Sequence, residues 1–180
     1  MKRFEFRKHI KLIDLKNINE YELNNHSINL INVDYKSNFI SEKISNKSKH
    51  YIKKSFEIAF DMIRFGVSDK LINGPISKKH FLSKKYLGVT EYIAEHFFSK
   101  KNAMLIYNKN LSVCPITTHL PLKFVSKKIN QSLLNEKILL IYDFYKKNLK
   151  INPRIAVLGV NPHCESIDKF NEDEKIVAPA

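Results

Sequence analysis

Glycine and cysteine are scarce in this chain of 180 residues, which has 4 glycines, 2 cysteines and no tryptophan. So few glycines exclude the glycine-rich loop that binds a dinucleotide phosphate in Rossmann-type proteins. Cys114 and Cys164 are too few for a disulfide framework, which favours a reducing cytoplasm. No apolar run approaches the roughly 20 residues needed to span a bilayer, and no apolar stretch follows the charged N-terminus. We therefore expect a cytoplasmic protein with no membrane contact and no secretory signal.

Charge of one sign is abundant: 31 Lys and Arg residues against 18 Asp and Glu residues give a formal net charge of +13. A nucleic-acid partner would require these charges to be clustered. They are instead scattered along the chain, as in a lysine-rich protein encoded by an AT-rich genome. We therefore expect no nucleic-acid partner, while a phosphorylated small-molecule substrate remains compatible with the charge.

The apolar pattern predicts alternating strands and helices, and a hydrophobic fraction of 43% is enough to form a core. Strands are predicted at 4–15, 28–33, 70–72, 103–107, 111–118 and 155–160. Helices are predicted at 41–65, from 77, from 90 with Thr90 as the N-cap, and at 133–149. The continuous apolar run at 155–160 is typical of a parallel strand covered on both faces. This order indicates an α/β sheet with helices on its faces.

His119 and His163 are the main candidates for chemistry among the 7 histidines. Each ends an apolar run inside a compact polar motif, Thr-Thr-His-Leu-Pro-Leu at 117–122 and Gly-Val-Asn-Pro-His at 159–163. Either alone could be structural. Two imidazoles at the carboxyl ends of two strands indicate two of the three protein ligands of a metal site, with an open coordination position for substrate. No third ligand is apparent.

Other reactive side chains have simpler interpretations. Cys164 is predicted to be a small loop residue rather than a ligand or nucleophile, and His96 to be a packing residue beside Phe97. Glu91, Glu165 and Asp168 lie near the motifs and could support a histidine ring from the outer shell of a metal site. For each of them, a first-turn helix charge or a solvated acid is the favoured interpretation.

Four motifs occur in a specific order: Asn-Gly-Pro-Ile-Ser-Lys at 73–78, Gly-Val-Thr-Glu at 88–91, the motif at 117–122, and Asn-Pro-His at 161–163. Together they resemble the 4-hydroxythreonine-4-phosphate dehydrogenase family, from about residue 41 to the end. The resemblance implies an isocitrate/isopropylmalate dehydrogenase-like layered sheet with helices on both faces, in a two-lobed homodimer with its site in a cleft.

The resemblance also implies a reaction. The family oxidises 4-phosphooxy-L-threonine with NAD and decarboxylates the product to 3-amino-2-oxopropyl phosphate, in pyridoxine and pyridoxal phosphate biosynthesis. His119 and His163 match two of the three histidines that hold a divalent metal (Zn, Mg or Co), and Thr90 matches a substrate-binding threonine. The residues that bind NAD and the catalytic residues are not identified by these motifs.

Three departures from the family pattern qualify this expectation. Val89 stands where the family has a substrate-contacting histidine, an N-terminal Gly-Asp-Pro motif is lacking, and most of the second lobe is absent. Residues 1–180 are therefore expected to form a partial, incomplete α/β dehydrogenase that is inactive alone. Two alternatives stay open: a sister dehydrogenase for another phosphorylated hydroxy acid, suggested by Val89, and a non-catalytic basic nucleic-acid-binding module.

Overall fold

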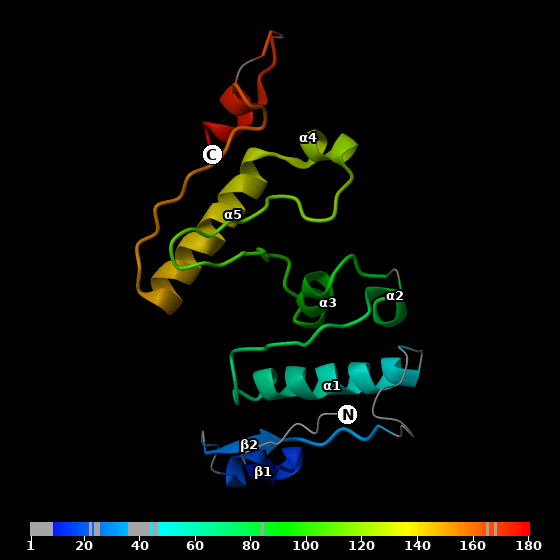
Figure 1. The fold of residues 1–180 in the computed structure, drawn as a ribbon. Coiled ribbons are helices and arrows are strands. Elements are labelled where there is room, and N and C mark those ends of the chain that lie inside the picture. The colour runs from blue at the N-terminus through cyan, green and yellow to red at the C-terminus, as the bar shows by residue number, and fades with distance from the viewer. Residues whose placement is uncertain are drawn as a thin grey trace, which may run out of the picture. The chain divides into compact units, whose positions relative to one another are not determined.

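The computed structural model describes residues 9–21, 23, 26–35, 44, 47–83, 85–164, 166–167 and 169–180. The chain forms two compact units, Met1–Lys84 and Lys85–Ala180. In chain order the elements are β1 (His9–Leu12), η1 (Leu15–Glu20), β2 (Ser27–Leu30), α1 (Lys47–Arg64), α2 (Lys78–Phe81), α3 (Val89–His96), η2 (Leu122–Phe124), α4 (Val125–Lys128), α5 (Gln131–Phe144), η3 (Tyr145–Leu149) and η4 (Asp173–Val177) (Figure 1).

The first unit contains a small parallel sheet. Strands β1 and β2 pair in parallel, with His9 opposite Ser27 and Leu12 opposite Leu30. The backbone N–H of Ile13 extends the ladder by donating to the carbonyl of Leu30 at 2.9 Å, and the Ile13 side chain is buried. Both predicted strands form but are shorter than predicted, since the first ends at Leu12 and the second at Leu30. Residues 4–8 of the first prediction lie outside the described residues.

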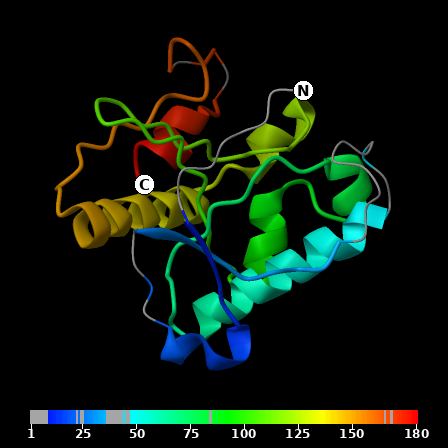
Figure 2. The ribbon, with the colours of Figure 1, turned by 60° about the horizontal axis from the view of Figure 1, so that its bottom comes forward.

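Helix α1 supplies the core of the first unit. Phe56 and Phe60 lie one turn apart and are 6% and 0% exposed, and Phe81 of α2 stacks on Phe56 with ring centroids 5.5 Å apart. Gly66 follows the helix at φ +74°, a left-handed conformation that favours glycine at a helix end. The predicted helix is thus confirmed from residue 47 onward (Figure 2).

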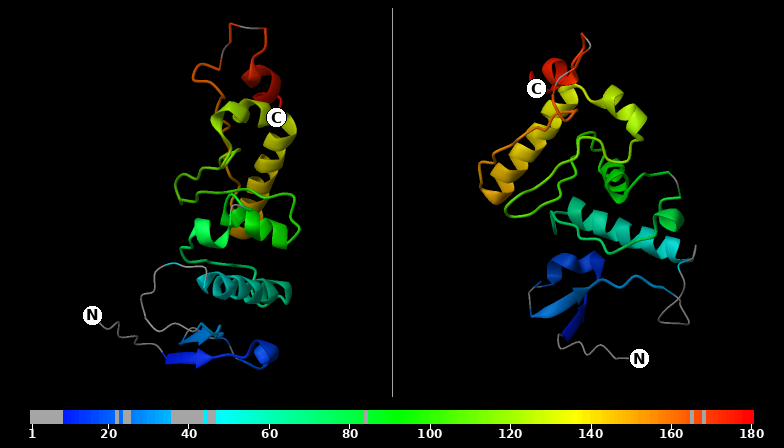
Figure 3. Two further views of the ribbon diagram at one scale, coloured as in Figure 1. Left: turned by 90° about the vertical axis from the view of Figure 1, so that its right-hand side faces the viewer. Right: turned by 45° about the horizontal axis from the view of Figure 1, so that its top comes forward.

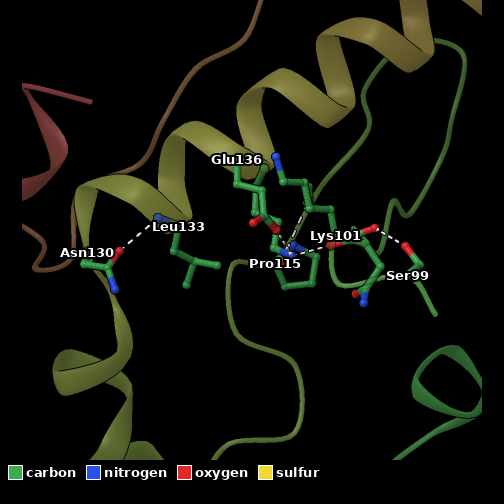
Figure 4. A network of polar contacts seen from close by, with 9 residues as sticks. Ser99, Lys101, Pro115, Asn130, Leu133 and Glu136 are labelled. Atoms are coloured by element: carbon green, nitrogen blue, oxygen red, sulfur yellow. Dashed lines mark hydrogen bonds and ion pairs between the residues drawn. The ribbon is translucent and has the colours of Figure 1, made fainter. Parts of the chain in front are cut away.

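Helix α5 is the longest helix of the second unit. Its N-cap is Asn130, whose Oδ1 accepts the backbone N–H of Leu133 at 2.9 Å (Figure 4). Leu134 is 2% exposed and marks the inner face. The predicted helix is confirmed, but part of its apolar surface is open to solvent: Leu139 and Phe144 are 62% and 41% exposed.

Fewer strands form than the sequence predicts. The predicted strands at 103–107 and 111–118 meet as a hairpin through one antiparallel bridge, Ile106 to Val113, with N–H to carbonyl distances of 2.8 and 3.0 Å. Residues 70–72 form no strand. Within the described part of the chain, β1 and β2 are the only strands joined by a longer ladder.

The run at 155–160 is the clearest correction to the predicted sheet. It is extended but not a strand, and it appears as a trace without an arrow in Figure 3. Val157 is 42% exposed and Leu158 is 85% exposed, so the run is not covered on both faces. A strand is defined by backbone bonds to a neighbour. No described segment supplies them, so the apolar pattern alone misassigned these residues.

No helix in the described part of the chain is long and apolar enough to cross a bilayer.

Candidate functional site

The first histidine site is built on the start of helix α3. Gly88 is the N-cap, with φ −157°, so the prediction that Thr90 caps the helix is wrong. The extended backbone at Gly88 starts the helix two residues earlier and places Thr90 in its first turn, exposed. Tyr92 anchors the helix: it is 6% exposed and meets the ring of Tyr86 edge-on, with centroids 5.2 Å apart.

His119 lies against this helix start. A Cβ atom placed on Gly88 would be 2.7 Å from Oε2 of Glu91 and 3.2 Å from Nε2 of His119. The hydroxyl of Thr118 donates to Oε1 of Glu91 at a long 3.5 Å. Gly88 thus leaves room for both groups, since a Cβ there would press on the ring and push the end of the flexible Glu91 side chain aside.

The polar atoms around Gly88 are not fully hydrogen-bonded. Oε2 of Glu91 is buried and has no partner among the described residues. No hydrogen bond to either ring nitrogen of His119 is found in that part of the structure either, and the residue is exposed. The site thus combines an inward-facing carboxylate with an imidazole whose nitrogens are available. The sequence favoured a plain first-turn helix charge for Glu91 and gave no sign that Gly88 touches His119.

The second histidine lies in a loop held by a buried aspartate. Asp173 is 7% exposed; its Oδ1 accepts the backbone N–H of Val160 at 2.7 Å, and its Oδ2 accepts Nδ2 of Asn161 at 3.3 Å. Oδ1 of Asn161 in turn accepts the backbone N–H of His163 at 3.1 Å. The backbone of the loop is therefore fixed by side-chain acceptors, while the His163 side chain is exposed.

Asn171 completes this network. It is 6% exposed, its Nδ2 donates to the carbonyl of Cys164 at 3.0 Å, and its Oδ1 accepts the backbone N–H of Asp173 at 2.9 Å. The loop also packs tightly, because a Cβ on Gly159 would overlap Sγ of Cys164. The sequence pattern indicates only a polar stretch at 168–175 and does not identify Asn171 or Asp173 as structural residues. The available signal was an Asn-x-Asp pair placed shortly after the Asn-Pro-His motif.

The two histidines belong to separate clusters. Neither a hydrogen bond nor a ring contact joins His119 to His163 among the described residues, and no group of three or more His, Cys, Asp or Glu side chains there could hold a metal ion. Glu165 and Asp168 lie outside the described residues. Two exposed imidazoles suit a divalent cation as part of a ligand set. The residues therefore fit such a group only if further ligands come from elsewhere.

His96, Cys114 and Glu95 lie outside the two histidine clusters. His96 packs on Tyr92 with ring centroids 4.4 Å apart and its Nδ1 lies 2.9 Å from the Tyr92 carbonyl, which confirms a packing role. Burial raises the pKa of the half-buried Cys114 thiol. On the exposed side of α3, a hydrogen bond from Lys85 holds the pKa of Glu95 below its ordinary value.

Comparison with known proteins shows which family this chain matches. Residues 2–180 match the family described as "Pyridoxal phosphate biosynthetic protein PdxA". A curated 4-hydroxythreonine-4-phosphate dehydrogenase of Sulfurihydrogenibium sp. (strain YO3AOP1) is 32% identical over 176 residues, which cover 95% of this chain and 53% of that protein. A similar enzyme of Aquifex aeolicus is 34% identical over 108 residues, covering 58% of this chain and 33% of that protein.

Solved structures agree with the sequence comparison. The crystal structure of 4-hydroxythreonine-4-phosphate dehydrogenase from Klebsiella pneumoniae superimposes with a TM-score of 0.76 at 26% identity, covering 96% of this chain and 54% of that one. A putative enzyme of the same name from Salmonella typhimurium, at 23% identity and a TM-score of 0.78, supports the fold. The chain spans about half the length of the Sulfurihydrogenibium and Klebsiella proteins. With its mixed strands and helices and a match over nearly every residue, this chain belongs to the PdxA family of pyridoxal phosphate biosynthetic proteins.

Proposed function

We propose that this chain carries part of the active site of a 4-hydroxythreonine-4-phosphate dehydrogenase. The reaction is the NAD-dependent oxidation of 4-phosphooxy-L-threonine, followed by decarboxylation to 3-amino-2-oxopropyl phosphate in vitamin B6 biosynthesis. The observation that carries the proposal is the pair of exposed imidazoles, His119 and His163, at motifs shared with the family that matches residues 2–180.

The roles of the chain's own residues follow from their placement. His119 and His163 would hold a divalent cation (Zn, Mg or Co), which lowers the pKa of a bound alcohol and polarises a ketone. The Asp173 network holds the backbone before His163 in one conformation, so the ring is presented without a large loss of entropy. Thr90, exposed in the first turn of α3, would donate its hydroxyl to the anionic substrate near the positive end of the helix dipole.

The rest of the site would come from outside these residues. Because the chain spans about half of its relatives, a third metal ligand and the groups that bind NAD are assigned to another polypeptide segment. We propose that the complete assembly is a cytoplasmic homodimer with the layered sheet of the isocitrate and isopropylmalate dehydrogenases. The chain of 180 residues alone is then expected to be inactive.

A chimera tests this proposal. The part of the Sulfurihydrogenibium enzyme that lies beyond its match to this chain would be joined after Ala180, and NADH formation from 4-phosphooxy-L-threonine would be followed with each metal. We expect turnover by the chimera and none by residues 1–180. His119→Ala and His163→Ala in the chimera should each abolish turnover, whereas His26→Ala, an exposed histidine of the first unit, should not. Full turnover by either of the first two variants would refute the assignment.

A sister dehydrogenase is the second candidate, and Val89 favours it. Val89 is half-buried beside Gly88 and cannot form a side-chain hydrogen bond to substrate. A substrate lacking the corresponding polar group would then be preferred over 4-phosphooxy-L-threonine. Comparing the chimera with its Val89→His variant on phosphorylated hydroxy acids decides between the two. A rise in kcat/KM for 4-phosphooxy-L-threonine alone would support the main proposal, and a loss on another substrate would support the sister enzyme.

A further inference from the structure

We infer that Glu91 is a positioning residue for His119. Its buried oxygen Oε2 would accept the Nε2 proton of the imidazole and so fix which ring nitrogen is left to bind other groups. That nitrogen is Nδ1. The identity of what Nδ1 binds rests on the proposed function, whereas the choice between the two neutral forms of the ring does not.

The orientation of the ring is the first support. The ring atoms nearest to the Cβ position of Gly88 are Nε2 at 3.2 Å and Cδ2 at 3.7 Å. This edge of an imidazole is opposite Nδ1, so Nδ1 is turned away from Gly88. Oε2 of Glu91 lies 2.7 Å from the same Cβ position. Both Oε2 and the Nε2 edge of the ring thus border the space beside Gly88, and Nδ1 faces away from it.

The unsatisfied carboxylate oxygen is the second support. Oε2 of Glu91 is buried without a partner among the described residues, and a buried acceptor without a donor is unfavourable. The nearest side-chain group that can become a donor at Gly88 is the Nε2–H of His119. Gly88 has no side chain, so the space beside it is open, and rotation of the Glu91 or His119 side chain into that space would bring Oε2 and Nε2–H together.

A helix-capping role does not account for this carboxylate. In a capping box the residue at the third helical position accepts the backbone N–H of the N-cap. Glu91 holds that position, but no such bond to Gly88 is found within the described chain. Its other oxygen is approached instead by the Thr118 hydroxyl at 3.5 Å, from the residue next to His119. Both oxygens of the carboxylate thus face the histidine loop.

The consequence for chemistry follows from the behaviour of imidazole. A carboxylate that accepts one ring N–H fixes the tautomer and the ring orientation, and it makes the opposite nitrogen a better electron donor. His119 would then present Nδ1 in a fixed direction. His163 differs, because its backbone is held and its ring is not.

Nuclear magnetic resonance of the metal-free chain with ¹⁵N-labelled histidine tests the inference directly. We expect His119 to be in the Nε2–H form with a downfield, slowly exchanging ring proton. Glu91→Ala should remove that signal, and Gly88→Ala should weaken it by forcing the two groups apart. Glu95→Ala, one turn further along α3, is the matched control and should leave the signal unchanged. A His119 ring in the Nδ1–H form, or one unaffected by Glu91→Ala, would overturn the inference.

Cobalt binding gives the second readout. Titration of the metal-free chimera with Co²⁺, followed by visible absorption, should show about 10- to 100-fold weaker binding for Glu91→Ala, the usual effect of losing an outer-shell partner. Glu91→Gln should lose less, because its amide oxygen can still accept the Nε2 proton. Equal affinity of wild type and His119→Ala would refute the proposed function, while the resonance experiment would still decide the role of Glu91. An unchanged affinity in Glu91→Ala, with His119→Ala impaired, would refute the positioning role.

Discussion

The two histidine loops differ in what the protein holds fixed. In the His163 loop, buried acceptors on Asp173 and Asn161 fix the backbone, and the ring is left exposed. In the His119 loop, a buried carboxylate faces the ring itself and one of its oxygens lacks a donor. A backbone that is fully hydrogen-bonded contributes to stability, whereas an unsatisfied carboxylate lowers it. The first arrangement stabilises the loop that carries one candidate ligand, whereas the second leaves an unsatisfied carboxylate oxygen near the other candidate ligand.

Removing Asp173 should have the largest effect on stability. Asp173→Ala leaves the N–H of Val160 and the amide of Asn161 without their acceptor, which should lower the free energy of unfolding by about 2–3 kcal/mol. Urea denaturation of the chain measures this. Glu174→Ala changes the exposed neighbouring acid and is the control. If Glu91→Ala lowered the free energy of unfolding as much as Asp173→Ala, the Glu91 carboxylate would be as stabilising as the Asp173 network, and the contrast drawn between the two loops would be wrong.

Filling the space at Gly159 should have the next largest effect. A Cβ there would overlap Sγ of Cys164 and lie 3.2 Å from the Asn161 carbonyl oxygen, so Gly159→Ala should cost about 1–3 kcal/mol. The double variant Gly159→Ala/Cys164→Ala should recover part of the loss, since only the contacts with the Asn161 carbonyl at 3.2 Å and with Oδ1 of Asp173 at 3.3 Å then remain. Gly74→Ala is the control, because nothing lies within 4 Å of a Cβ at that position. Full additivity of the two changes would show that the sulfur is not the obstacle.

Replacing either candidate ligand should change stability little. Both side chains are exposed, so His119→Ala and His163→Ala should each alter the free energy of unfolding by no more than about 0.5 kcal/mol. His96→Ala should cost more, because its ring packs on Tyr92. Thermal unfolding compares the three. A large loss for His163→Ala would mean that this ring, like the backbone around it, is structural.

Replacing Glu95, the exposed acid near the end of α3, should have the smallest effect on stability, and this effect should depend on pH. Because the pKa of Glu95 is lowered in the folded state from 4.5, its pairing with Lys85 stabilises the fold above that value. The contribution disappears as the pH falls through the lower, folded-state pKa. Glu95→Gln should therefore lower the melting temperature slightly at pH 7 in low salt and leave it unchanged below the folded pKa. An equal difference at both pH values would exclude the ion pair as its cause.

Local sequence patterns predicted the helices well. The helix predicted at 41–65 corresponds to α1, which is followed by Gly66, and the helix predicted at 133–149 corresponds to α5, in which Leu134 is buried. Both depend on contacts within a few residues along the chain. The run at 155–160 failed as a strand because pairing depends on a partner segment that its own pattern does not specify.

The candidate site was predicted only in its exposed parts. His119 and His163 stand out because a histidine ends each apolar run. The role of Asp173 depends on bonds to Val160 and Asn161, 13 and 12 positions away, and that of Asn171 on a bond to Cys164, 7 positions away. The role of Gly88 depends on the absence of a Cβ beside His119, and none of these properties can be read from spacing. The Thr90 cap was wrong for a related reason. Threonine and glycine are similar N-caps by propensity, and here glycine leaves room beside the helix start for His119 and Glu91.

The uncovered run at 155–160 also has a consequence for handling the protein. It joins four large or branched aliphatic side chains at 38–85% exposure, Ile155, Val157, Leu158 and Val160, with no charge among them. Extended stretches of this composition stack on copies of themselves as intermolecular β-structure. Concentrated stocks should accordingly become turbid with time, and a lysine introduced at Leu158 should delay this by interrupting the stack with a charge.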